Sequence, residues 1–350
     1  MKKGILILLL GLVIVITAGF LLYHHQHQSN IRYLTISTTT SLYDTGLLDT
    51  IAEIFKRKYN IELRFIPKGT GAAIEDAKNG VCDAIMVHAR SKELEFMKEG
   101  YGVNRKVFAY NFFVIVGPKD DPAGIRGLPP VEALKKIAEA GREGKIIWIT
   151  RDDGSGTNTK EIYLWKLAGY NYSEIKKERW VYRTGSGMGN TLRIADTKGG
   201  YTLSDTATFL KYKKEGIIHN LDILVDKGSE LINIYSIILI NPKKYKKDYH
   251  DAVLLAKWLT GEEGQRVIGE FGKKEFGKPL FYPIVEVLKK REEPFFTWIL
   301  KYGFIKDGDV LTECPKEFRY GKNFTFSEFR ISDLEYSHTH NVLNHNGSVK

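Results

Sequence analysis

Residues 145–167 read KIIWITRDDGSGTNTKEIYLWKL. The apolar run at 145–149 predicts a buried strand, and the apolar spacing over 160–167 predicts a helix. Between them, RDDGSGTN contains the Ser, Thr and Gly residues that are typical of a helix N-terminus. A strand that leads through such a loop into a helix is the repeating unit of α/β folds. The stretch therefore predicts an α/β fold, in which this loop either caps its helix or also binds a ligand.

The same arrangement occurs three more times along the chain. The loops STTTSLYDTG (37–46), KGTGAA (68–73) and RTGSGMGN (183–190) each follow a predicted strand and precede a predicted helix. Ligands bind at the carboxyl ends of strands in open α/β sheets, where exposed helix N–H groups favour an anion. One such loop is most simply a capped helix start. Four of them, distributed over two lobes, indicate a shared anion site.

The order of the predicted elements indicates one two-lobed domain over residues 31–290, with a largely parallel sheet. We expect lobe 1 to comprise about 31–115 and 230–290, and lobe 2 about 116–229. The chain would cross to the second lobe near 113–118 and return near 230.

The two ends of the chain differ from this domain. An apolar run from Ile5 to Tyr23 follows Lys2 and Lys3. Residues 1–30 are therefore predicted to be a membrane anchor or signal segment, with the remainder outside the cell. Residues 291–350 form an aromatic-rich extension, which we expect to dock on a lobe, followed by a disordered tail.

Composition is compatible with an anionic partner without identifying it. The formal net charge is +10, which suits an anion but also an ordinary Lys- and Glu-rich surface. Export argues against nucleic acid as the partner. Two cysteines are too few for a disulfide framework.

Sequence patterns of common enzymes are missing from the chain. No loop matches GxxxxGK[ST] or GxSxG, and Asp152 and Asp153 have no nearby His or Glu cluster that would complete a metal site. We therefore predict no catalytic residues, no metal and no cofactor. Among the basic residues, Arg151 is the best candidate for contact with an anion, because a guanidinium matches paired oxyanion oxygens. Its alternative role is pairing with a carboxylate such as Asp152 or Asp153, and Lys68 and Arg183 are expected to be peripheral.

Several motifs occur in an order that identifies a family. They are STTTSLYDTGLL, GTGAAIEDAKNGVCDAIMVHA, EGYGVNRKVFAYNFFVIVGPKDDPAGI, RDDGSGTNTKEIYLW, TGSGMGNTLRIADTKGGYTLSD and WLTGEEGQRVI. Over roughly residues 33–285 the sequence resembles the tungstate-binding proteins of ABC transporters, within the phosphate/molybdate-like periplasmic solute-binding proteins. The resemblance implies a type II periplasmic-binding-protein-like fold, with two Rossmann-like lobes joined by a two-strand hinge. A tetrahedral oxyanion, tungstate above all, would bind between the lobes.

The resemblance also assigns ligand contacts in all four loops. They would be Thr39, Thr40, Ser41, Thr70, Gly71, Arg151, Ser155, Gly156, Thr157, Ser186, Gly187 and Met188. The sequence departs from the family pattern at Asn158, where many relatives have His, so any role for that side chain is in doubt.

The resemblance implies a monomer that delivers its oxyanion to an ABC permease while anchored to the cell membrane, or secreted if the anchor is cleaved. Molybdate or phosphate in the same role is the first alternative, and phosphate stays open because Asp44, Asp152 and Asp153 lie near the loops. An anchored oxyanion sensor is a second alternative. An enzyme acting on a phosphorylated substrate is a third.

Overall fold

The computed structural model describes residues 17, 31–322 and 324–333. Within those residues, no helix has the length and apolar character needed to span a bilayer. The anchor or signal segment predicted at 1–30 lies outside the described residues except for Thr17, and so does the tail at 334–350.

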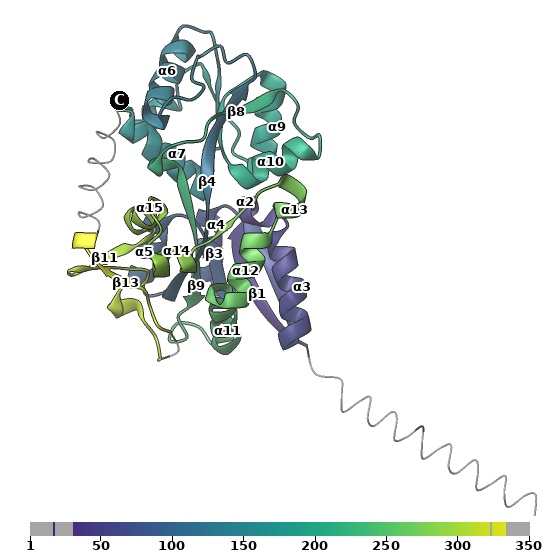
Figure 1. The fold of residues 1–350 in the computed structure, drawn as a ribbon, viewed down its shortest axis with the longest axis vertical. Coiled ribbons are helices and arrows are strands. Elements are labelled where there is room, and N and C mark those ends of the chain that lie inside the picture. The colour runs from purple at the N-terminus through teal and green to yellow at the C-terminus, as the bar shows by residue number, and fades with distance from the viewer. Residues whose placement is uncertain (1–16, 18–30, 323, 334–350) are drawn as a thin grey trace, which may run out of the picture.

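Two α/β lobes lie one above the other, and a single long strand, β4, runs from one into the other (Figure 1). Lobe 1 contains a sheet in the order β10-β4-β9-β3-β1-β2. Its strands are β1 (Arg32–Thr39), β2 (Ile61–Lys68), β3 (Ala84–Val87), β4 (Gly102–Pro118), β9 (Ile232–Ile240) and β10 (Tyr282–Pro283).

Helices cover both faces of the lobe 1 sheet, because its strands are apolar on both sides. Alternate residues of β1 and β3, such as Leu34 and Met86, pack with α3, α11 and α12, whereas Ile85 and Val87 pack with α4 and α5. The helices are α2 (Thr40–Tyr43), α3 (Leu47–Tyr59), α4 (Thr70–Lys78), α5 (Arg90–Lys98), α11 (Tyr249–Thr260), α12 (Glu262–Glu270), α13 (Lys273–Phe276) and α14 (Val285–Lys290).

Lobe 2 is built on the second half of β4. Phe113 and Ile115 face a core with α6 and α7, whereas Val114 and Val116 face α9 and α10, as expected for a strand with alternating side chains. The strands are β5 (Trp148–Thr150), β6 (Val181–Arg183), β7 (Thr202–Asp205) and β8 (Leu221–Val225). The helices are α6 (Pro130–Arg142), α7 (Gly156–Leu167), α8 (Tyr172–Ile175), α9 (Met188–Lys198), α10 (Thr206–Lys214) and the 3-10 turn η1 (Ser229–Leu231).

The sheet is mixed rather than largely parallel as the sequence predicted. β1 pairs in parallel with β2 and β3, and β5 with β6. The crossing strand β4 is antiparallel to β7, β8, β9 and β10, and β9 is antiparallel to β3. The antiparallel pairs arise because β4 leaves lobe 1 and the chain returns through β9 in the opposite direction.

The extension packs against the sheet beside the crossing point. Phe296, Ile299, Leu300 and Phe304 are buried against residues of β4, β9 and α14, among them Ile234. Its elements are α15 (Phe295–Gly303), β11 (Ile305–Asp307), β12 (Val310–Thr312), η2 (Lys316–Phe318) and β13 (Glu328–Arg330). In Figure 1, α15 lies between α7 of lobe 2 and α5 of lobe 1.

Candidate functional site

Four strand-to-helix junctions meet between the lobes. The starts of α2 and α4 belong to lobe 1, and those of α7 and α9 to lobe 2. A Cβ atom built on Gly187 of lobe 2 would lie 3.5 Å from Thr40 Oγ1 of lobe 1, and one built on Gly69 would lie 3.5 Å from the Ser155 Cβ atom. The structure therefore brings all four predicted loops to one place.

Two buried hydroxyls at this place are unpaired. Thr40 Oγ1 and Thr70 Oγ1 have no hydrogen-bond partner among the residues that the structure describes, and Thr70 is 0% exposed. A buried polar atom without a partner costs free energy. These hydroxyls are therefore donors that a bound anion could satisfy.

The helix starts supply backbone donors in addition. The side chains of Thr39 and Ser155 cap α2 and α7 by accepting from the N–H groups of Leu42 and Asn158. The N-cap positions of α4 and α9, Gly69 and Gly187, make no side-chain capping bond. The first N–H groups of a helix have no partner within the helix, so α4 and α9 present donors to the space between the lobes.

Arg151 is 3% exposed and is fixed by its own loop. Its guanidinium donates to the Asp153 carboxylate at 2.6 and 3.1 Å, to the carbonyl oxygen of Ser186 at 3.2 Å and to Thr157 Oγ1 at 3.3 Å. Asp153 also accepts from the backbone N–H of Ser155. The carboxylate pairing considered as an alternative therefore exists, and it orients the guanidinium within the site.

The other predicted contact residues lie at the same four helix starts. Ser41 Oγ lies 3.3 Å from Thr39 Oγ1, and the Met188 side chain is buried in lobe 2, which leaves only its backbone for a ligand. A Cβ atom on Gly71 would lie 3.4 Å from the carbonyl oxygen of Gly154. Contact of the twelve residues with an oxyanion stays a prediction.

Residues expected to be peripheral are paired elsewhere. Lys68 bonds Asp76 at 2.7 Å, and Arg183 bonds Asp152 at 2.6 Å. Asp152 also accepts from Lys176 at 3.0 Å. Asn158 has a structural role, because its amide donates to the Tyr172 hydroxyl and its carbonyl accepts from Gly154 N–H.

His88, which is not among the twelve predicted contacts, also lies at the site. It follows β3, its Nε2 lies 3.3 Å from Ser41 Oγ, and its Nδ1 is unpaired within the described residues. Its ring packs against Gly156 of lobe 2. A Cβ atom built on Gly156 would lie 2.5 Å from His88 Cε1. Burial, with a smaller contribution from the charge of Arg151, lowers the pKa of His88 to about 3. The ring is therefore neutral, and its position at the carboxyl end of a buried strand was the sequence signal for it.

The arrangement gathers hydroxyls, helix N-termini and one guanidinium where the lobes meet, and groups of these kinds can hold an anion without its water. Among the described residues, no group of three or more His, Cys, Asp or Glu side chains is placed to hold a metal ion.

Two α/β lobes that face each other across such a site define a solute-binding protein, and a family model described as a PBP superfamily domain matches residues 24–263. A putative ABC transporter anion-binding protein of Haloferax volcanii is 44% identical over 259 residues, which cover 71% of each chain. The tungstate-binding protein TupA of Peptoclostridium acidaminophilum is 38% identical over 71% of this chain and 85% of its own.

The solved structure of the tungstate ABC transporter protein from Geobacter sulfurreducens is 41% identical, with a TM-score of 0.62. The match covers 68% of this chain and 98% of that one. The chain belongs to the family of these tungstate-binding proteins of ABC transporters, within the PBP superfamily.

Proposed function

We propose that this protein binds tungstate between its two lobes and delivers it to an ABC permease. The observation that carries the proposal is the pair of unpaired buried hydroxyls, Thr40 and Thr70, at helix starts that lie against the loops of lobe 2. Relatives that are 38% and 41% identical are named for tungstate, which supports this ion over others.

The hydrogen bonds that the nearby carboxylates already accept favour a fully deprotonated oxyanion as the ligand. A protonated phosphate needs an acceptor for its O–H group, whereas tungstate needs donors alone. Asp153 is occupied by Arg151 and the Ser155 N–H group, and Asp152 by Lys176 and Arg183. Two of the three carboxylates near the loops are therefore already paired, which favours tungstate and molybdate over phosphate, with Asp44 as the remaining acceptor near the site.

Calorimetric titration with tungstate, molybdate, sulfate and phosphate tests the proposal. We expect tungstate and molybdate to bind far more tightly than phosphate. Arg151→Met should weaken tungstate binding at least roughly a hundredfold, since it removes charge-assisted hydrogen bonds worth about 1.5–3 kcal/mol each. The matched control is Arg183→Met, which removes an exposed guanidinium at the edge of the same loops. Phosphate binding more tightly than tungstate would overturn the assignment.

The proposed site of action is the outer face of the cell membrane, with a monomer held there by the segment at residues 1–30. The apolar run behind Lys2 and Lys3 supports the anchor, and delivery to a permease requires the binding domain on the side from which the ion enters. If residues 1–30 are cleaved, the protein is secreted.

A further inference from the structure

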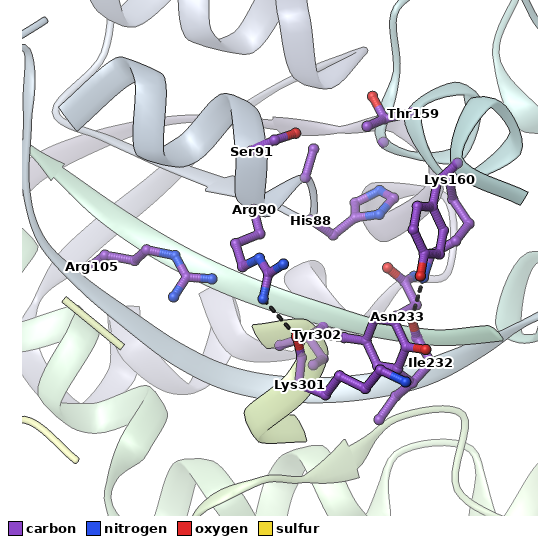
Figure 2. Close-up of a pocket in the computed structure, with 14 residues that line it drawn as sticks. His88, Arg90, Ser91, Arg105, Thr159, Lys160, Ile232, Asn233, Lys301 and Tyr302 are labelled. Carbon is purple, nitrogen blue, oxygen red and sulfur yellow. Dashed lines mark hydrogen bonds between the residues drawn. The ribbon is translucent and has the colours of Figure 1, made fainter. Parts of the chain in front are cut away.

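A cavity adjoins the candidate oxyanion site and shares His88 and Gly156 with it. Its volume is about 360 Å³, within the range of roughly 300–1,000 Å³ that is typical of sites for small organic ligands. Lobe 1 contributes His88 and Arg90, lobe 2 contributes Lys160, and α15 of the extension contributes Lys301 and Tyr302 (Figure 2).

The lining is strongly cationic. It contains Arg90, Arg105, Lys160 and Lys301 and no carboxylate. Buried Arg105 is compensated by Glu93, whose carboxylate lies 2.7 Å from the guanidinium. The other three cations make no ion pair with any carboxylate that the structure describes.

Two of those three cations, Arg90 and Lys160, are held in place by neutral groups. Arg90 donates to the carbonyl oxygens of Lys301 and Phe304 at 2.7 and 2.9 Å, at the end of α15. Lys160 donates to the carbonyl oxygens of Glu230 and Ile232 at 2.7 and 3.0 Å. Carbonyl oxygens fix the positions of these charges without neutralising them.

The charged form of Lys160 is disfavoured by burial and by the neighbouring charge of Arg90. Together they lower the pKa of Lys160 to about 7, although the charge of Glu230 acts in the opposite direction. An anion in the cavity would favour protonated Lys160, because opposite charges stabilise each other in a partly desolvated site.

The remaining walls are apolar and aromatic. Ile232 and Ile234 line one side, and the Tyr163 and Tyr302 rings, whose centres lie 6.3 Å apart, line another. Such walls suit a carbon skeleton, and the space exceeds what one tetrahedral oxyanion would fill. Arg90 and Lys301 belong to lobe 1 and the extension, whereas Lys160 belongs to lobe 2, so two anionic groups could be bound at once.

We propose that this cavity is a second ligand site, which binds a small organic dicarboxylate between α7 and α15. Lys301 and Tyr302 lie beyond residue 263, where the match to the family model ends. The site therefore depends on the extension and does not follow from membership of the family.

Phthalate is a suitable probe, because its two carboxylates are attached to a ring that the tyrosines could contact, and the probe is larger than a tetrahedral oxyanion. The purified protein is saturated with tungstate and titrated with phthalate in a calorimeter. We expect one equivalent to bind, and binding to weaken as salt rises. Lys301→Gln should reduce the affinity roughly tenfold, as expected for one charge-assisted contact, and Lys301→Glu should abolish binding.

Lys301 is exposed, so neither substitution should prevent folding, and unchanged tungstate affinity will verify this. Lys166→Gln, at an exposed position of α7 outside the cavity, should leave phthalate binding intact. The proposal fails if wild-type protein binds neither phthalate nor glutarate at millimolar concentration. It also fails if uncharged dimethyl phthalate binds equally well, or if tungstate displaces phthalate. Failure to bind tungstate would instead count against the proposed function, since phthalate can be titrated into protein without tungstate.

Discussion

At the scale of single residues, the candidate site differs from the rest of the core because some of its buried hydroxyls have no hydrogen-bond partner among the described residues. Thr38 and Thr70 are equally buried, but Thr38 Oγ1 donates to the carbonyl oxygen of Met86 at 3.0 Å, whereas Thr70 Oγ1 has no partner among the described residues. We therefore expect the first hydroxyl to stabilise the lobe and the second to lower its stability unless a bound anion pairs with it.

The two threonines therefore predict opposite effects of the same substitution. Thr70→Val should weaken tungstate binding roughly tenfold, while the ligand-free protein keeps or gains stability, because an unpaired buried hydroxyl is removed. Thr38→Val should lower the free energy of unfolding by about 1 kcal/mol and leave affinity unchanged. Calorimetry and denaturant unfolding of both variants check this. Equal losses of stability in the two variants would contradict it.

Sequence could predict the hydroxyl-rich loops but not the state of each hydroxyl. Thr38, Thr40 and Thr70 are all threonines at strand-to-helix junctions. Whether a given hydroxyl is satisfied depends on atoms from distant segments, such as the Met86 carbonyl 48 residues away from Thr38. The place of His88 in the site could not be predicted for the same reason, since its neighbour Gly156 belongs to the other lobe.

At the scale of elements, the first turn of α7 belongs to the candidate site, and a later residue of the same helix anchors it to β5. Its first turn faces the oxyanion site, and one turn further on Glu161 is buried in lobe 2. The Glu161 carboxylate accepts from Trp148 Nε1 at 2.6 Å and from Thr150 Oγ1 at 2.7 Å, both on β5. This carboxylate therefore joins α7 to the strand that precedes the Arg151 loop.

The Glu161 carboxylate predicts a pH dependence of stability. Burial raises its pKa from 4.5 to about 7, so the native state holds the proton more tightly than the unfolded chain. Its contribution is complete below about pH 4.5 and is lost as the pH rises through about 7. At pH 8, Glu161→Gln should therefore be more stable than wild type by up to about 3 kcal/mol, since each pKa unit is worth about 1.4 kcal/mol.

Denaturant unfolding between pH 5 and 8 measures this difference. The matched control, Glu174→Gln, lies at an exposed position of α8 and should follow the wild-type curve. A Glu161→Gln variant whose stability stays parallel to wild type across this range would contradict the prediction.

The sequence predicts helices and strands where local residue patterns determine them. The loop at 151–158 and its helix follow from capping residues and apolar spacing, and Ser155 does cap α7 by accepting from Asn158 N–H. The direction of β4 and β9 was missed, because apolar runs such as LINIYSIILI read the same in parallel and antiparallel sheets. Pairing direction is set by the long-range path of the chain.

At the scale of the whole molecule, the lobes are joined by direct bonds as well as by the space for a ligand. Lys92 Nζ of lobe 1 donates to the carbonyl oxygen of Gly154 in lobe 2 at 2.6 Å. Lys211 Nζ of lobe 2 donates to the carbonyl oxygen of Asp44 in lobe 1 at 2.6 Å. Separation of the lobes would break both bonds, so we expect them to favour closure in the same direction as a bridging anion does.

Removing these two bonds should therefore weaken ligand binding without damage to either lobe. Each bond is worth about 1 kcal/mol, so Lys92→Met with Lys211→Met should raise the tungstate Kd roughly ten- to thirtyfold. Small-angle scattering should show the radius of gyration falling on addition of tungstate in both proteins, with the variant requiring more ligand. Lys145→Met, at an exposed site of lobe 2 where the lysine pairs with nearby Glu143, is the control. An unchanged Kd in the double variant would show that closure does not depend on these bonds, and an unchanged radius of gyration on tungstate binding would contradict lobe closure as the mechanism.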